Sequence, residues 1–267
     1  MGYTDERNVA GMHNNRKADW VWNNILNYKK AFGRHAIDVS AVFEMQNRQT
    51  VNSSMSGKDQ ESPAYLWYNM NRLTDSKTIG SGFIRNQMVS VIGRLQYTFD
   101  DRYIVTASFR EDGASQLSPG SKWAFFPSGA FSWKMHEERF IRNLNVFDVL
   151  KIRASYGISG NQGISAYQTL SRYGQHKYFN GGKWVTAIGP GYQSGTTGQD
   201  GIYALWSGIP NKGLKWETTA QVDLGLDMSF FGNRLNVTFD WYDKRTSDLL
   251  RERNIAPSSG YDKMWVN

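Results

Sequence analysis

The stretch YTFDDRYIVTASFR, residues 97–110, contains two runs of alternating side chains on either side of a short acidic turn. In the second run Tyr103, Val105, Ala107 and Phe109 share one face, and most of their neighbours are polar. Successive side chains of a β-strand point to opposite faces, so the stretch predicts a hairpin with one apolar and one mostly polar side. The apolar side requires either a packed core or lipid against it.

The composition of the 267-residue chain narrows the alternatives. It has no cysteine, which excludes disulfides and thiolate metal sites. Its 26 glycines, 10 tryptophans, 14 tyrosines and 14 phenylalanines favour a β-rich architecture. The net charge of +7 would suit an acidic partner, but it is explained equally well as the local charge excess of a fragment. We expect no nucleic-acid partner. Residues 1–15 lack a charged-then-apolar signal segment, so we expect either a cytosolic protein or a piece of a longer one.

The same two-residue alternation recurs along the chain and predicts an all-β fold. Helical periodicity of the kind that marks βαβ units is missing. Eight candidate strands cover residues 19–31, 34–46, 88–99, 103–110, 122–136, 150–158, 221–230 and 235–242.

The links between these strands are uneven in length. Short links at 32–35, 99–102 and 231–234 alternate with long ones at 47–82, 111–121 and 160–214, and the link at 137–147 is intermediate. Short turns on one rim and long loops on the other are typical of bacterial outer-membrane barrels.

Aromatic residues gather near the strand ends, as at Tyr97, Phe99 and Tyr103, which is the placement that membrane interfaces favour. The mean hydropathy of −0.57 does not argue against a membrane barrel, because only every second residue of such a strand faces lipid. A soluble β-sandwich remains the competing interpretation. We favour an antiparallel transmembrane β-barrel segment with long extracellular loops.

Four stretches resemble motifs of one known family, in family order. They are DRYIVTASFREDGAS (101–115), WAFFPSGAFSWKMHEERF (123–140), LKIRASYGISGNQGI (150–164) and LKWETTAQVDLGLDMSFFGNRLNVTFDWYDKRTSDLL (214–250). The chain is similar through them to the SusC/RagA-like TonB-dependent outer-membrane transporters of Bacteroidetes. The resemblance implies that residues 1–267 are part of the β-barrel domain and supply about eight of its roughly 22 strands. It also implies that the plug and the N-terminal carboxypeptidase-like domain of the family are absent from this chain.

The resemblance implies TonB-dependent import of oligosaccharides, or of other large nutrients, across the cell outer membrane. The partners implied are a SusD-like surface lipoprotein, TonB acting through the absent N-terminal part, outer-membrane lipid, and an oligosaccharide or peptide substrate. Three alternatives stay open: a peptide-importing member of the same family, a surface adhesion or structural barrel, and a soluble sandwich that binds carbohydrate.

The motif residues are expected to be structural, because glycines permit tight strand exits and Pro127 inside a strand suggests a bulge or a rim position. This structural set is Arg110, Asp112, Gly113, Phe126, Pro127, Ser128, Leu150, Lys151, Arg153, Ser155, Tyr156, Gly157, Gly160, Asn161, Trp216, Glu217, Thr246 and Asp248.

Substrate contacts are expected in the loop 165–213, whose aromatic rings could stack on sugars or pack against the barrel rim. The candidates are Tyr167, Tyr173, Tyr178, Trp184, Tyr192, Tyr203 and Trp206. On the polar faces of the strands, Arg94, Lys151, Arg153 and Asp227 are expected to line the lumen or to contact a plug.

Nothing in the sequence predicts catalysis, a metal or a cofactor. The four histidines show no metal-ligand spacing, and no GxSxG nucleophile motif occurs. The glycine-rich GPGYQSG (189–195) follows no strand-to-helix pattern, so it does not indicate a phosphate loop. We therefore expect a protein that is not an enzyme.

Overall fold

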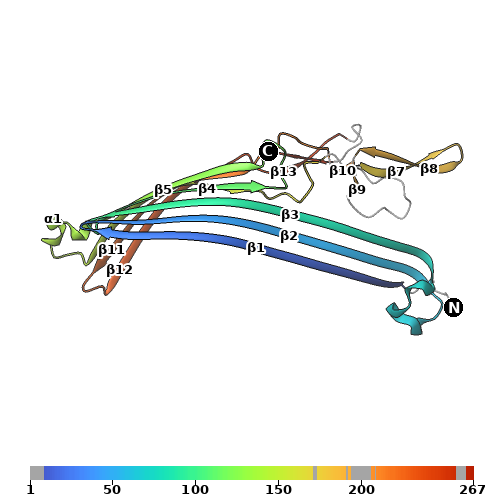
Figure 1. The fold of residues 1–267 in the computed structure, drawn as a ribbon, viewed down its shortest axis with the longest axis horizontal. Coiled ribbons are helices and arrows are strands. Elements are labelled where there is room, and N and C mark those ends of the chain that lie inside the picture. Colours follow the sequence, from blue (N-terminus) through green and yellow to red (C-terminus); the bar gives the residue numbers. More distant parts are fainter. Residues whose placement is uncertain (1–8, 171–172, 191, 194–205, 208, 257–262) are drawn as a thin grey trace. The chain divides into compact units, whose positions relative to one another are not determined.

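A computed structural model describes residues 9–170, 173–190, 192–193, 206–207, 209–256 and 263–267. Eight strands form one antiparallel sheet in the order β1-β2-β3-β4-β5-β6-β11-β12 (Figure 1). Their bounds are Val9–Phe32 (β1), His35–Gln60 (β2), Leu73–Phe99 (β3), Tyr103–Ala114 (β4), Trp123–Lys134 (β5), Val149–Asn161 (β6), Glu217–Phe230 (β11) and Leu235–Ser247 (β12).

Short elements occupy the links. The helical ones are the 3-10 turns η1 (Pro63–Tyr68), η2 (Met70–Arg72) and η3 (Met135–Glu137) and the α-helix α1 (Arg139–Arg142). The remaining strands pair two by two: β7 (Tyr173–Asn180) with β8 (Lys183–Pro190), β9 (Tyr192–Gln193) with β10 (Trp206–Ser207), and β13 (Arg251–Asn254) with β14 (Lys263–Val266). Within the described residues, no helix is long and apolar enough to span a membrane.

The predicted all-β fold and all eight predicted strands are confirmed, but the predicted link at 47–82 is wrong for most of its length. β2 continues to Gln60, and β3 begins at Leu73. Most of the residues concerned are polar or small, and the few larger apolar ones, Val51, Met55, Leu73 and Ile79, give no sustained alternation. Backbone ladder bonds form a strand regardless. The predicted link at 160–214 likewise contains β7–β10.

Strand length separates two groups. β4, β5, β6, β11 and β12 have 12 to 14 residues, close to the roughly 9–11 that a tilted strand needs to cross the hydrocarbon of a membrane. β1, β2 and β3 have 24, 26 and 27 residues. Part of each of these three strands must therefore lie outside the hydrocarbon.

The chain divides into two compact units, and β1–β3 contribute to both. The first unit comprises Met1–Val21 and Gln46–Gln87. Glycine makes room for a neighbouring side chain in this unit, because a Cβ on Gly82 would overlap the side chain of Asn52. Arg85 Nε donates to Asn47 Oδ1 at 2.8 Å, which fixes two polar side chains of neighbouring strands.

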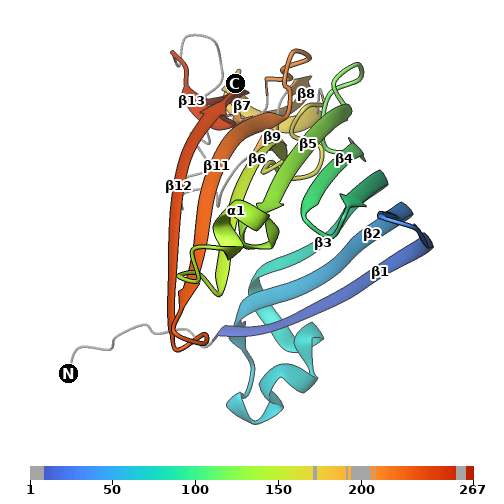
Figure 2. The same ribbon diagram turned by 90° about the vertical axis from the view of Figure 1, so that its left-hand side faces the viewer.

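The second unit, Trp22–Met45 and Met88–Asn267, contains a single curved layer in which β4–β6, β11 and β12 lie side by side (Figure 2). One face is apolar across the strands: Val105 pairs with Phe131, Phe131 with Ala154, Ala154 with Leu224, and Leu224 with Trp241. We call this the outer face. No second layer covers it in the described part of the chain, and Val105, Leu224 and Trp241 remain 47%, 48% and 49% exposed. This single layer agrees with a barrel wall and differs from the two packed sheets of a soluble sandwich.

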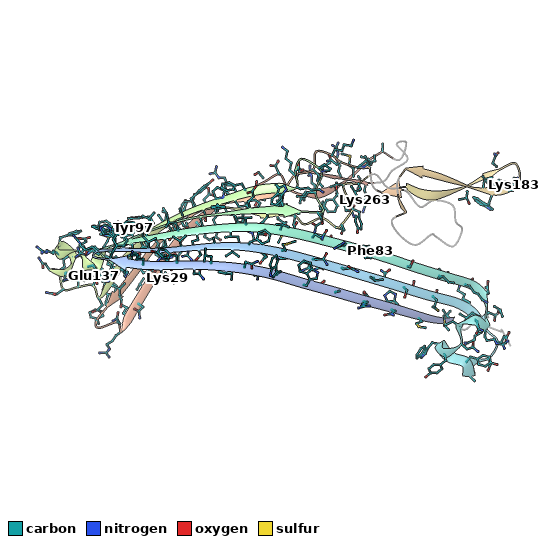
Figure 3. The ribbon with its side chains drawn as sticks, in the orientation of Figure 1. Lys29, Phe83, Tyr97, Glu137, Lys183 and Lys263 are labelled. Atoms are coloured by element: carbon teal, nitrogen blue, oxygen red, sulfur yellow. The ribbon has the colours of Figure 1, made fainter. Side chains whose placement is uncertain are left out.

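An aromatic belt crosses β1–β5 where the short turns lie. Its ring centroids are 5.1–6.3 Å apart from one strand to the next. The members are Phe32, His35, Tyr97, Phe99, Tyr103 and Trp133, and Tyr97 is labelled at this end of the sheet in Figure 3. This is the placement that a membrane interface favours.

Charged residues bind the turns beside the belt to one another. Arg34 pairs with Asp100 through two donors at 2.8 and 2.6 Å, and this hydrogen bond holds the pKa of the Asp100 carboxyl below its usual range. Glu138 accepts from Tyr103 Oη at 2.7 Å, from Trp133 Nε1 at 3.3 Å and from Arg102 at 3.3 Å. The hydrogen bond from Tyr103, followed by that from Trp133, lowers the pKa of Glu138.

A small buried core lies at the opposite end of these strands, under the long loops. It consists of Ala114, Leu117, Phe126, Ile164, Leu214 and Trp216. The Phe126 and Trp216 rings meet edge to face at 5.5 Å, and Trp216 Nε1 donates to the Lys122 carbonyl at 3.0 Å. A Cβ on Gly160 would overlap the Phe126 ring, so this glycine makes room for the core.

We expect Glu138→Gln to remove part of the acid sensitivity of the folded barrel. A depressed carboxyl pKa contributes stability above the unfolded pKa, and that stability is lost as pH falls through the folded pKa. Thermal unfolding of the complete receptor between pH 7 and pH 3 measures the effect. Glu137→Gln, which removes a carboxylate paired with exposed Arg142, is the control. An acid response of Glu138→Gln identical to that of the unsubstituted protein would contradict the assignment.

We expect Gly160→Val to destabilise the loop base by about 1–3 kcal/mol, because the new side chain would have to displace the Phe126 ring. Gly129→Val is the matched control, since its nearest non-neighbour atom to a Cβ is 3.8 Å away. The two variants are compared by thermal unfolding of the folded barrel and by protease cleavage of the loops. Equal effects at both positions would show that the ring contact is unimportant.

Candidate functional site

The candidate site is the polar face of the sheet in the second unit, which we call the inner wall. One row of cross-strand neighbours crosses it: Ser108 pairs with Ser128, Ser128 with Gly157, Gly157 with Gln221, and Gln221 with Lys244. The Ser108 and Ser128 hydroxyls are 2.6 Å apart and hydrogen-bonded. Short polar side chains in the middle of this wall leave it hollowed.

Two hollows of about 350 and 510 Å³ adjoin on the inner wall and share Ser128, Ile158 and Ser159. The first is lined by hydroxyls and small residues of β4–β6 and β11, together with Gln221 and Asp223. The second lies against the loop core and adds Arg110 and Gln162. Hydroxyl and amide groups in these positions can form hydrogen bonds with an uncharged polar molecule.

Arg153 is the centre of a charged group on this wall. Its guanidinium donates to both oxygens of Asp227 at 2.9 Å and to Asp240 at 2.9 Å. A Cβ on Gly225 would be 2.7 Å from the Arg153 Cζ, so that glycine gives the guanidinium its place between the two aspartates. Lys151, on the same face, pairs across the strands with Lys134 and Asp227.

Arg110 organises a second charged group, nearer the loops. Its Nε lies 2.7 Å from both oxygens of Asp112, and its Nη2 donates to Ser90 at 3.0 Å and lies 3.7 Å from Glu44. Its partners Asp112 and Ser90 are buried. Arg94, on the same wall, donates a hydrogen bond to Gln96 at 3.0 Å. Two cationic groups of the wall, Arg153 and Arg110, are thus matched by carboxylates of the chain itself.

Several motif residues hold the ends of the long loops. Glu217 accepts from Asn161 Nδ2 at 3.2 Å and from the Leu250 amide at 3.0 Å. Thr246 shares a hydroxyl hydrogen bond of 2.9 Å with Thr219. Asp248 adopts a left-handed backbone, with φ of 52°, where β12 ends.

The other motif residues lie at separate places in the sheet. At Gly113 the Trp123 ring lies against the glycine backbone. Leu150 is buried, and its backbone amide donates to His136 Nδ1 at 3.3 Å. Pro127 pairs with Phe109 of β4 and lies just beyond the β5–β6 ladder, which begins at Ser128. Pro127 therefore lies inside β5, at the point where the pairing of β5 with β6 ends.

Two further motif residues occupy opposite faces. Ser155 donates to Asp223 at 3.1 Å on the inner wall. Tyr156 belongs instead to the outer face, where it is 48% exposed and pairs with Gly129 and Val222. We therefore expect the Tyr156 ring to contact lipid in the membrane.

The loop aromatics proposed as substrate contacts are not brought together among the described residues. Trp184 is 53% exposed and meets Phe179 edge to face at 5.5 Å on the β7–β8 hairpin, whose turn is marked by Lys183 in Figure 3. Tyr167 is partly buried with a φ of 67°. Tyr203 lies outside the described residues. For Tyr173, Tyr178, Tyr192 and Trp206 only the backbone is described, in β7, β7, β9 and β10. The substrate-binding role of all seven stays a prediction.

Sequence reasoning missed three partners of the inner-wall arginines: Asp240, Glu44 and Ser90. Asp240 is 87 residues from Arg153 and meets it only through the β6–β11–β12 register. Its position on the polar face of a predicted strand was the available signal. Groups of three or more His, Cys, Asp or Glu suited to a metal ion do not occur within the described ranges.

Comparison with known proteins gives the same fold. Residues 2–266 match the family model described as TonB dependent receptor-like, beta-barrel. TonB-dependent receptor P3 of Formosa agariphila is 33% identical over 91% of this chain and 23% of its own length. TonB-dependent receptor SusC of Bacteroides thetaiotaomicron is 34% identical over 67% of this chain and 17% of its own length.

Among solved structures, the RagAB peptide transporter matches with a TM-score of 0.81 at 20% identity, over 96% of this chain and 26% of that chain. The RagAB peptide importer in its open-open state matches with a TM-score of 0.78 at 21% identity. The chain spans a quarter or less of the length of the curated relatives it matches. It belongs to the TonB-dependent receptor-like β-barrel family, whose members are transporters of the outer membrane rather than enzymes.

Proposed function

We propose that this chain forms one wall of a TonB-dependent transporter of the SusC/RagA type that imports oligosaccharides. The observation that carries the proposal is the contrast between the two faces of one sheet. Its outer face is apolar from Val105 to Trp241, whereas its inner wall holds hydroxyls and matched charges. A sheet of this kind suits a wall between lipid and a hydrated lumen.

The chemistry of the inner wall favours the proposal that the cargo is uncharged and rich in hydroxyl groups. Arg153 and Arg110 are paired with carboxylates of the same wall, and hydroxyls line the hollows between them. A sugar chain can exchange hydrogen bonds with such hydroxyls without the desolvation of a charge. The exposed Trp184 offers a ring for stacking on a sugar at the loop level.

A peptide cargo is the second candidate, because RagAB, which shares this fold, is a peptide transporter. The identity of 20–21% between the RagAB structures and this chain concerns the fold and leaves the cargo open. The partners we propose for the complete receptor are a SusD-like surface lipoprotein, which closes over the barrel mouth, and TonB, which supplies the energy. A surface adhesion barrel would need neither of them.

Deletion of the complete receptor gene tests the proposal. We expect uptake of fluorescent oligosaccharides to be lost and to return with the intact gene, while peptide uptake is unchanged. Loss of peptide uptake alone would favour the peptide alternative, and no loss of either cargo would contradict transport.

A pair of adjacent variants links the uptake to the inner wall. Ser128→Trp places a ring in the hollows, and we expect it to lower uptake about tenfold by narrowing the lumen. Gly129→Trp puts the same ring on the outer face, beside Ala107 and Tyr156, and should leave uptake within about twofold. Both variants are compared at equal surface abundance. Equal uptake by both would show that this wall does not line the path.

A further inference from the structure

The outer face of the second unit is not uniform, because a groove crosses it over β1–β5. The groove has a volume of about 1110 Å³ and is lined mainly by apolar side chains. Ligand pockets of roughly 300–1,000 Å³ hold molecules of drug size, so this groove has room for at least one fatty acyl chain.

Differences in side-chain size along the face create the groove. Ala41 and Ala107 form its floor, and Val39, Phe43, Leu95 and Phe109 stand around them. Each of these four larger residues is 37–45% exposed, so its apolar surface is available to an occupant.

One wall of the groove is fixed by the packing of aromatic rings. The Phe109 ring lies against the backbone of Gly93, where a Cβ would overlap it, and it stacks on Phe125 at 5.7 Å. On the other side Phe43 meets Trp22 edge to face at 6.1 Å. Rings held in this way keep the groove open instead of collapsing into it, which favours binding by lowering the ordering cost.

The depth of the groove in the membrane follows from its distance to the aromatic belt. Leu95 and Val91 lie four and eight residues before Phe99 of the aromatic belt. With a rise of about 3.3 Å per residue and a tilt of about 45°, these residues are roughly 9–19 Å from the belt. The apolar band of an outer-membrane barrel is about 25 Å tall, and short turns face the periplasm. The groove therefore extends into the outer leaflet.

We propose that this groove is a binding site for one acyl chain of lipopolysaccharide, the outer-leaflet lipid. The groove is continuous with the lipid-facing surface, and it offers apolar side chains of several strands around a small-residue floor. An acyl chain seated there contacts more surface than one lying on a flat strand face. The inference is independent of the cargo of the transporter.

The experiment uses the complete receptor purified in mild detergent, with native mass spectrometry and fatty-acid analysis of the retained lipid. We expect roughly one lipopolysaccharide molecule per receptor. Ala41→Phe and Ala107→Phe each fill the floor and should lower the retained lipid about fivefold. Val237→Phe, on the same face of β12 but outside the groove, is the control and should retain lipid as the unsubstituted receptor does.

Heat-modifiable gel mobility verifies that each variant forms a folded barrel. Two floor variants are used so that the test still stands if one of them does not fold. The proposal would be overturned by the absence of retained lipid in the unsubstituted receptor, by undiminished lipid in both folded floor variants, or by retention of phospholipid only. A second receptor copy or a partner protein in place of lipid would also overturn it, and native mass resolves both.

Discussion

The constraint on which the structure depends is that a single β-layer has no core of its own. All backbone groups inside a sheet are satisfied by neighbouring strands, so the side chains on each face are free to suit different media. Here one face presents Val105, Leu224 and Trp241, and the other presents Ser128 and Arg153. The exposed apolar side chains of the outer face suit contact with lipid, as expected for a barrel wall.

The two ends of the membrane-crossing strands carry different side-chain clusters, and this difference sets the orientation of the wall. At the short turns, aromatic rings such as Tyr97 and Trp133 form a belt, and Glu138 connects that belt to the neighbouring turns. At the long loops, Phe126 and Trp216 bury themselves in a small core. The aromatic belt therefore anchors the short-turn end of the wall at a membrane interface, and the small core packs the long loops onto its other end.

The strands and their faces could be predicted from the sequence because alternation is local: the sides of Val105 and Thr106 follow from a few neighbouring residues. The sequence did not predict that β2 runs to Gln60, because residues such as Asn52 and Gly82 are polar or small on either side. Nor could it place Phe126 against Trp216 or Arg153 against Asp240, since contacts across 87 to 90 residues follow from strand order and register. The motifs predicted which residues have structural roles, and the strand register shows which of them are in contact.

The account is tested most directly by the media that two adjacent side chains of β4 experience. Val105→Cys and Thr106→Cys, each labelled with a small fluorophore in the complete receptor, are reconstituted into brominated-lipid bilayers. Bromine in the acyl chains should quench the probe at residue 105 strongly, and a water-soluble quencher should reach the probe at residue 106. If both probes respond alike to the two quenchers, the sheet does not separate lipid from a hydrated lumen.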